Sequence, residues 1–206
     1  MMDTAFLITT FVTLFIIVDP IALTPMFVAL TRGLTPAQRR TIGLRACLAA
    51  AAILTVFALA GEAVLNFIGI SMPAFRIAGG ILLFLTALEM LFERRSQRRE
   101  DQADLDDFPD PSIFPLAIPL LAGPGAIASV ILLVGEAPGY VGTISVLGVL
   151  FAVLAIVFVF FLSAGLLERG LGKTGINIVT RLFGMLLAAL AVQFVLDGLR
   201  GFGIAG

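Results

Sequence analysis

The sequence has no histidine and no tryptophan, and it has one cysteine, Cys47, and one tyrosine, Tyr140. A single thiol cannot form a disulfide within the chain, so no disulfide framework is possible. Without histidine, and with one thiol only, a metal site built on imidazole or thiolate ligands is not expected. We expect no metal ion, no other cofactor and no nucleic-acid partner.

Charged residues are scarce as well. Only 13% of the 206 residues are charged, whereas 60% are apolar. Soluble globular domains have about 25% charged residues, so this composition indicates an integral membrane protein. The first apolar stretch follows no basic segment and is too long for a signal peptide, so we expect it to remain as a membrane span.

Six apolar segments approach or exceed the roughly 20 residues that a helix needs to cross a bilayer. They are Ala5–Leu30, Ile42–Ala60, Ala74–Phe92, Ile113–Gly135, Val141–Leu167 and Asn177–Leu199. The sequence therefore predicts an all-α membrane protein with six transmembrane helices. The apolar segment Gly61–Pro73, between the second and third spans, either lies at the membrane interface or dips into the membrane.

The long polar tract Glu93–Pro111 has four arginines followed by six acidic residues. Such dense charge cannot bury a core, so we interpret the tract as a solvated linker. It divides the chain into a first three-helix half, residues 1–92, a charged linker, 93–111, and a second three-helix half, 112–206.

Basic residues are concentrated in alternate loops. With the N-terminus outside, the loops on the inside hold Arg32, Arg39, Arg40, Arg45, Arg94, Arg95, Arg98, Arg99, Arg169, Lys173 and Arg181. The outside then holds only Arg76 and Arg200. Cytoplasmic loops carry the excess of lysine and arginine, so we expect both termini on the periplasmic side of the inner membrane and the linker in the cytoplasm.

The two halves share an ordered set of short motifs. Pro20 matches Pro124 at an offset of 104 positions, and Arg76-Ile-Ala-Gly79 matches Arg181-Leu-Phe-Gly184 at an offset of 105. Each half has an odd number of spans, so the second half must enter the membrane from the opposite side. We predict two inverted three-helix repeats, with broken first and fourth helices, related by a pseudo-two-fold axis in the membrane plane.

Prolines interrupt the first span at Asp19–Pro25 and the fourth span at Ala122–Gly125. Proline has no amide hydrogen and clashes with the preceding turn, so backbone groups lose their helical partners there. Paired breaks in the two halves of a membrane protein indicate a transporter's binding site. We expect both segments to be non-helical and to meet near the bilayer midplane. The candidate substrate-binding residues are Asp19, Pro20, Thr24, Ala122, Gly123, Pro124 and Gly125.

Asp19 is the clearest ionisable residue at membrane depth, where such groups are costly and usually functional. Two interpretations stay open for it. Its carboxylate is either the site of a coupling proton or ion, or a cap and hydrogen-bond acceptor that holds the broken helix together. We also consider that it meets the ammonium group of a zwitterionic substrate.

The second break carries no charge. Pro124 suits the first turn of a new half-helix, whose positive dipole end would attract a carboxylate. Gly123 and Gly125 would let a small ligand approach the backbone. The alternative for glycines is close helix packing, which we expect for Gly79, Gly80 and Gly184.

Other polar residues have less specific roles. Thr31, Ser129 and Gln193 are uncharged candidates that could complete a pocket. We expect interfacial or structural roles for Glu89 and Asp197. For Arg76 and Arg181, which occupy equivalent helix ends, the default expectation is anchoring to loop carbonyls or lipid phosphates.

The motifs V-D-P-I-A-L-T-P-M-F, G-I-S-x-P-x-F-R-I-A-G-G and P-L-A-I-P-L-L-A-G-P-G-A-I together resemble the MarC family over nearly the whole chain. The resemblance implies six helices with inverted halves, and transport of small neutral amino acids such as glycine and alanine. It also implies that Asp19–Pro25 and Ala122–Gly125 line the substrate site. Many members have asparagine before the first proline, where this chain has Asp19. This difference from the family pattern leaves open whether the substrate and the coupling ion are those of the characterised members.

We therefore expect a secondary transporter of small neutral amino acids, coupled to protons or to sodium, and not an enzyme, since no nucleophile–base pair or set of metal ligands is present. The alternatives are an exporter of another small metabolite or drug, and a membrane scaffold that transports nothing. A drug exporter usually has a roomier apolar cavity, and a scaffold needs no polar break.

Overall fold

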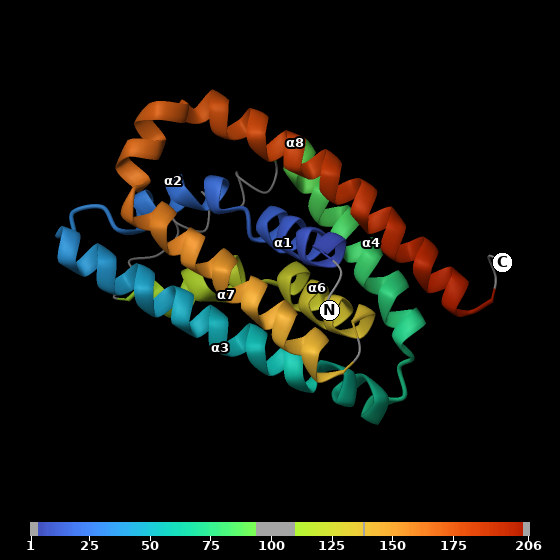
Figure 1. Cartoon of the computed structure of the whole chain (residues 1–206). Coiled ribbons are helices and arrows are strands. Elements are labelled where there is room, and N and C mark those ends of the chain that lie inside the picture. The colour runs from blue at the N-terminus through green and yellow to red at the C-terminus, as the bar shows by residue number, and fades with distance from the viewer. Residues whose placement is uncertain (1–3, 94–109, 138, 204–206) are drawn as a thin grey trace.

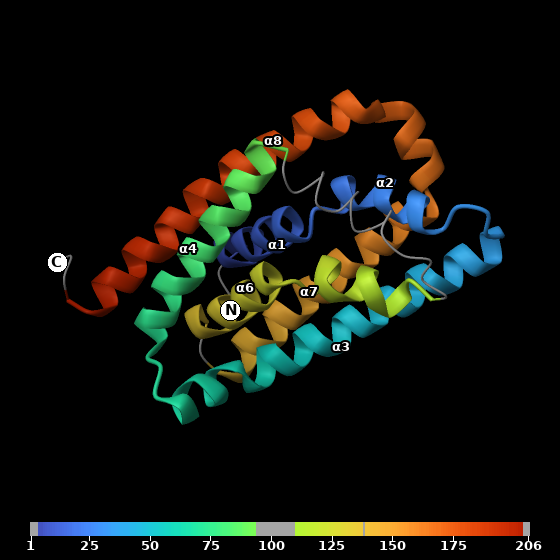
Figure 2. The same ribbon diagram turned by 180° about the vertical axis from the view of Figure 1, so that it is seen from behind.

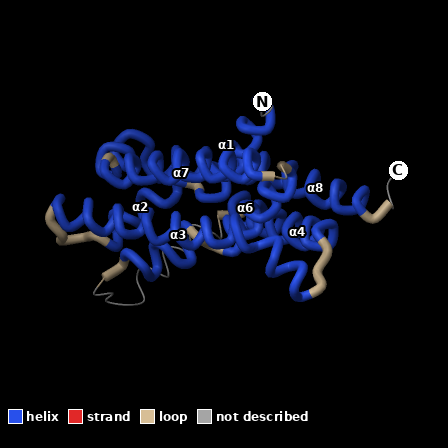
Figure 3. Tube along the Cα trace, turned by 60° about the horizontal axis from the view of Figure 1, so that its bottom comes forward, coloured by secondary structure: helices blue, strands red, loops and turns tan. Residues whose placement is uncertain are grey.

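The computed structural model of the chain describes residues 4–93, 110–137 and 139–203. The regular elements of these residues are all helical, and no strand occurs among them (Figure 3). Most of the expected linker, 94–109, including Arg94, Arg95, Arg98 and Arg99, lies outside the described residues.

Eight helical elements follow one another in the described part of the chain. They are α1 (Thr4–Val18), α2 (Pro20–Leu30), α3 (Pro36–Ile68), α4 (Met72–Leu91), η1 (Ser112–Leu121), α6 (Pro124–Glu136), α7 (Tyr140–Leu162) and α8 (Ala164–Gly201).

Five helical segments among the described residues are long and apolar enough to cross a membrane. They are Thr4–Leu30, Pro36–Ile68, Met72–Leu91, Tyr140–Leu162 and Thr174–Gly201. The pair η1 and α6, which is bent by 54° at its break, gives a sixth when it is counted as one span. The all-helical membrane architecture predicted from the sequence is therefore confirmed.

The ends of the helices follow local sequence signals. Thr35 and Gln38 form a reciprocal capping box at the start of α3, with Pro36 in the first turn. Ser71 caps α4 by accepting a hydrogen bond from the amide of Ala74. Hydroxyl side chains at these positions satisfy amides that the first helical turn leaves without partners.

Several helix boundaries differ from the sequence prediction, and two of them are the ends of α3 and α7. The helix α3 continues to Ile68, so the first part of Gly61–Pro73 is its last two turns, and Gly69 ends it with a φ of 86° that suits glycine. The fifth span was predicted to run to Leu167, but α7 ends at Leu162. Chain hydrophobicity continues past Ser163, whereas the helix axis turns there and α8 begins at Ala164. A change in helix direction within an apolar stretch cannot be predicted from hydropathy.

The helices α1 and α6 lie in the centre of the molecule (Figures 1 and 2). On one side the pair α4 and α8 packs against them, and on the other side α3 and α7 do. The two halves of the chain are thus interleaved, because each of these outer pairs takes one helix from each half. This arrangement places the C-terminal end of α1 in the interior, with the first turn of α6 beside it.

Glycines allow α4 and α8 to approach closely. A Cβ atom added at Gly80 would lie 2.8 Å from the carbonyl oxygen of Ala191, and one added at Gly184 would lie 3.0 Å from that of Ala87. A Cβ at Gly79 would lie 2.9 Å from Cδ1 of Leu132 in α6. The packing role expected for Gly79, Gly80 and Gly184 is therefore confirmed, as is usual for small residues between membrane helices.

The outer surface of the bundle is strongly apolar. Phe67 is 92% exposed, and Leu166, Ile8 and Met185 are each more than half exposed. An apolar exterior of this kind suits contact with lipid chains rather than water. Few polar side chains lie in the interior of the described part of the chain, and Asp19, Thr24 and Ser129 among them lie near the two helix breaks.

Candidate functional site

The first break consists of Asp19 alone. Its backbone has φ 54° and ψ 67°, in the left-handed region, and its side chain is fully buried. Oδ1 of Asp19 accepts a hydrogen bond of 3.3 Å from the amide of Ala22, so the carboxylate caps α2. A left-handed residue other than glycine costs about 1–2 kcal/mol, which the cap helps to offset.

The prediction that Asp19–Pro25 is non-helical is wrong beyond Asp19, because α2 begins at Pro20 and contains Pro25. A proline in the first position of a helix loses no hydrogen bond, since that amide has no partner in any case. Pro20 therefore starts α2 rather than unwinding it. Pro25 removes one internal bond, which the helix tolerates.

The second break is longer on its N-terminal side than predicted. Phe114 (φ −124°, ψ 124°) and Ile118 (φ −125°, ψ 123°) have extended backbones within η1. Each directly precedes a proline, and the proline ring disfavours the helical region for the residue before it. Ala122 and Gly123 are non-helical as predicted, whereas Pro124 and Gly125 already belong to α6.

Gly123 is required by the backbone itself. A Cβ atom added there would lie 2.5 Å from the carbonyl oxygen of Pro119, which is closer than real Cβ atoms come. The glycine therefore permits the chain to fold back between η1 and α6. This structural requirement is a role other than the ligand access expected from the sequence.

Gly125 brings the two breaks together. A Cβ atom added at Gly125 would lie 3.6 Å from Cγ2 of Ile17 in α1, 3.5 Å from Cδ2 of Leu83 and 3.7 Å from Oγ1 of Thr86. Ile17 is two residues before Asp19, so the end of α1 lies beside the start of α6. The predicted proximity of the breaks therefore agrees with the packing around Gly125.

The starts of the two half-helices differ in how they are capped. Asp19 caps α2, whereas no side chain caps α6. The first-turn amides of a helix have no intrahelical acceptor, and Gly125 and Ala126 supply these amides in α6. The start of α6 is thus the end at which an added anionic group finds donors.

Hydroxyl groups near the breaks donate to their own helices. Oγ1 of Thr24 donates to the carbonyl of Pro20 at 2.9 Å, and Oγ of Ser129 donates to that of Gly125 at 2.8 Å. Oγ1 of Thr31, which lies at the other end of α2 and not near the break, donates to the carbonyl of Phe27. Their oxygen lone pairs can still accept hydrogen bonds from a ligand.

Thr10 and Thr13 in α1 are site candidates that sequence reasoning missed. Both side chains are fully buried, and neither hydroxyl has a hydrogen-bond partner among the described residues. Their spacing places them on the same face of α1 as Ile17, the residue beside Gly125. A hydroxyl stripe repeating at i, i+3 within an otherwise apolar helix is the signal that could have revealed them.

Of the remaining charged candidates, Arg76, Glu89 and Asp197 lie near the ends of their helices. Arg181 lies well inside α8, so the prediction that it occupies a helix end is wrong. Arg181 forms an ion pair of 2.6 Å with Glu93, so it is anchored to a carboxylate and not to a loop carbonyl. Asp197 accepts hydrogen bonds from Gln193 and pairs with Arg200 at 3.2 Å. Nε of Arg76 is buried without a partner among the described residues, and Glu89 is half-buried.

An apolar bundle whose helices are long enough to cross a bilayer five or six times is that of a multi-pass helical membrane protein. Its candidate site comprises the buried carboxylate, the uncapped helix start and the buried hydroxyls near the two helix breaks. A family model described as MarC family integral membrane protein matches residues 4–202. The chain belongs to the MarC family.

Relatives cover nearly the full length of the chain. The UPF0056 membrane protein MJ1677 of Methanocaldococcus jannaschii is 38% identical over 97% of this chain and 98% of its own. The UPF0056 inner membrane protein YhgN of Escherichia coli K12 is 37% identical over 94% of this chain and 96% of its own. YvbG of Bacillus subtilis is 34% identical, with 96% and 95% covered. No solved structure matches the chain.

Proposed function

We propose that the protein is a secondary transporter of small neutral amino acids, with glycine and alanine as the first substrates to test. The observation that carries the proposal is the contact between the two breaks, in which Ile17 at the end of α1 lies beside Gly125 at the start of α6. Broken helices that meet inside a membrane bundle are the usual setting of a transporter's binding site.

The groups around the breaks match the two charges of an amino acid. The uncapped start of α6 offers amides and the positive end of the helix dipole to the substrate carboxylate. Asp19 offers a carboxylate to the ammonium group. The side chains of Ile17, Leu83 and Thr86 lie at van der Waals distance from the Gly125 position, so little volume is left for the substrate's side chain.

We further propose that the two halves are inverted repeats which move against each other. The reciprocal contacts of Gly80 with Ala191 and of Gly184 with Ala87 support this. Gly184 follows Gly80 by 104 positions, and Ala191 follows Ala87 by 104 positions, one position from the offset of 105 at which the sequence motifs match Gly184 to Gly79. Such reciprocity is what a two-fold axis between α4 and α8 requires. The packing of α1 on α7 and of η1 on α3 follows the same rule.

Asp19, Thr24 and Ala122 are buried in this arrangement, whereas Gly123 and Gly125 are half-buried and Pro124 is exposed. Transport then requires that the halves open alternately to each side. Asp19 carries the coupling proton in this scheme, with sodium as the alternative coupling ion. Both termini face the periplasm, as the distribution of arginine indicates.

Counterflow in proteoliposomes tests the proposal. Vesicles loaded with unlabelled glycine or alanine should accumulate the radiolabelled form when the wild-type protein is present. Gly125→Val should abolish counterflow while the protein still inserts, because two added methyl groups fill the space between Ile17 and Leu83.

A matched control is Gly148→Val in α7, where no atom lies within 4 Å of the added Cβ position. It should transport like the wild type. Absence of counterflow for glycine, alanine and serine with folded wild-type protein would overturn the proposal.

A further inference from the structure

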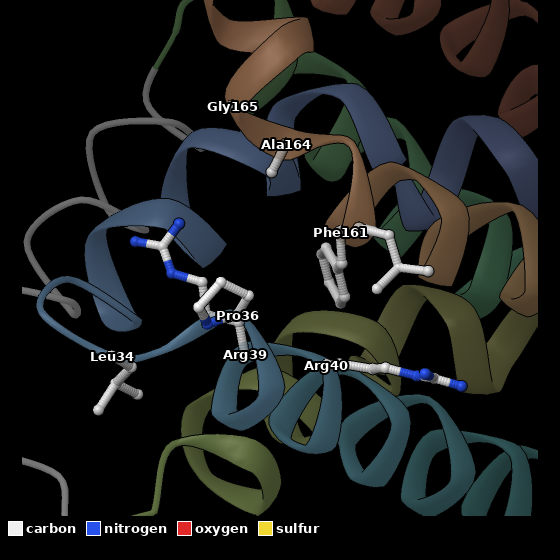
Figure 4. A pocket seen from close by; sticks show the side chains of 8 residues that line it. Leu34, Pro36, Arg39, Arg40, Phe161, Ala164 and Gly165 are labelled. Atoms are coloured by element: carbon white, nitrogen blue, oxygen red, sulfur yellow. The ribbon is translucent and has the colours of Figure 1, made fainter.

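A cavity of about 440 Å³ lies between the start of α3 and the junction of α7 with α8. Leu34, Pro36, Arg39 and Arg40 line one side, and Phe161, Leu162, Ala164 and Gly165 line the other (Figure 4). None of these residues belongs to either break. The cavity is therefore separate from the site of the proposed transport.

The apolar side of the cavity is a firmly packed wall. The ring of Phe161 stacks on that of Phe27, with ring centroids 4.2 Å apart and planes 8° from parallel. Gly43 lets this pair sit against α3, since a Cβ added there would lie 3.4 Å from the Phe161 ring. Leu162, the next residue, is 55% exposed, so the apolar surface continues from the cavity to the outside of the bundle.

The basic side of the cavity has unused hydrogen-bond donors. Nε of Arg39 donates to the carbonyl of Thr31 at 3.1 Å, which holds this side chain against the end of α2. Figure 4 shows the guanidinium of Arg39 turned toward α2, while Arg40 extends along α3 in the other direction. Among the described side chains, no carboxylate forms an ion pair with either arginine.

We propose that this cavity binds the phosphate group of an amphiphile, with the phosphate on Arg39, the apolar chain along Phe161 and Leu162, and Arg40 adding positive charge from the other side of the cavity. Arginine is suited to phosphate because its planar guanidinium presents several N–H donors to the phosphate oxygens. An apolar wall that runs from a basic cavity to the lipid-facing surface fits a molecule with an anionic head and an acyl chain.

Phosphate at this position has two sources, a phospholipid headgroup and a soluble phosphate ester. The anionic lipids of the cytoplasmic leaflet attract basic residues near the surface, and the arginine distribution puts this end of the molecule on that side. The headgroup of phosphatidylglycerol is therefore the source that we expect, and the experiment includes glycerol 3-phosphate to separate the two.

Native mass spectrometry of the purified full-length protein in detergent measures the binding directly. Phosphatidylglycerol, zwitterionic phosphatidylcholine and glycerol 3-phosphate serve as probes. The variants are Arg40→Gln, which removes no hydrogen bond seen among the described residues, and Arg39→Gln/Arg40→Gln. The control is Arg32→Gln, which removes an exposed charge from the neighbouring loop without touching the cavity.

The wild type should bind phosphatidylglycerol more tightly than phosphatidylcholine, and the double variant should lose about tenfold in affinity, the effect of one lost charge-assisted hydrogen bond. Arg40→Gln should show a smaller loss with unchanged thermal stability, and Arg32→Gln should bind like the wild type. Binding of glycerol 3-phosphate with the same variant profile, and no preference among lipids, would keep the phosphate site and assign it to a soluble ligand.

If Arg32→Gln and Arg40→Gln lost the same affinity for phosphatidylglycerol, binding would depend on the net charge of this surface and not on the cavity. That result would overturn the proposal. No loss in the double variant would overturn it as well.

Discussion

Gly80 in α4 lies against the backbone of Ala191 in α8, so that a Cβ atom at Gly80 would be 2.8 Å from the Ala191 carbonyl oxygen. The reverse contact joins Gly184 in α8 to Ala87 in α4. The two contacts exchange the roles of the two helices, which lie side by side (Figure 1) and are the most extensively packed pair among the described helices.

The first prediction concerns this crossing. Gly80→Ala and Gly184→Ala should each lower the stability of the purified protein, because the added methyl group meets backbone that cannot shift alone. Overpacking of this kind costs about 1–3 kcal/mol. Thermal unfolding in detergent measures the effect. Gly148→Ala is the control, since nothing lies within 4 Å of its Cβ position. If all three variants melt at the same temperature, the crossing does not depend on glycine.

The second prediction separates the two glycines of the second break. Gly123→Ala should destabilise the protein, because its Cβ would lie 2.5 Å from the carbonyl oxygen of Pro119. Gly125→Ala should fold normally, because its nearest neighbour, Cδ2 of Leu83, would be at an ordinary contact distance of 3.5 Å. Yield and melting temperature of the two variants give the comparison. A stable Gly123→Ala protein would show that the turn does not require glycine.

A third prediction concerns Asp19. Asp19→Ala should lose the cap on α2 and place alanine in the left-handed region, for a combined cost of about 2–3 kcal/mol. Asp19→Asn should keep both the cap and the backbone, since asparagine adopts this conformation and offers an acceptor oxygen. Melting temperatures of the two variants show whether capping is the structural role of this residue.

Transport by Asp19→Asn then separates the remaining roles. If Asp19 carries the coupling proton, exchange should persist while accumulation driven by a pH gradient is lost. If it binds the substrate ammonium, exchange itself should weaken at every pH, by roughly 1.5–3 kcal/mol in binding. Unchanged exchange and unchanged accumulation would remove Asp19 from the mechanism.

The fourth prediction concerns Thr13. Thr13→Val should leave stability unchanged or raise it, because a buried hydroxyl without a partner is costly and valine has nearly the same shape. Counterflow should fall if the hydroxyl contacts substrate or water on the way to the breaks. Val146→Thr, which introduces a hydroxyl at a fully buried position of α7, is the opposite change and should lower stability. Full counterflow in Thr13→Val would exclude the threonine from the pathway.

A fifth prediction is topological. In a background with the buried Cys47 replaced by alanine, a single cysteine at Tyr140, which is 82% exposed, should react with an impermeant reagent from the periplasm. A cysteine at Arg32 should react with the same reagent only after the membrane is permeabilised. The asymmetry of arginine motivates this orientation. The reverse pattern of labelling would invert the proposed topology.

Part of the fold and part of the candidate site could be predicted from the sequence. The apolar runs determined the helical membrane class, because a bilayer demands long apolar helices whatever they pack against. Thr35 and Ser71 set the starts of α3 and α4 through local capping, and Pro20 and Gly123 marked where the chain leaves one helix axis for another. The sequence also singled out Asp19 by its charge alone.

The sequence by itself thus determined which stretches of the chain form membrane helices and that two of these break near Asp19 and near Gly123, since these features depend on neighbours within a few residues. The tertiary structure decided the rest. It limited the first break to Asp19, it brought Ile17 beside Gly125, and it gave Gly123 a backbone role rather than a ligand-facing one. It also buried Thr10 and Thr13 without partners and opened the cavity beside Arg39. Each of these depends on residues far apart in sequence, whose proximity is set by how the helices pack.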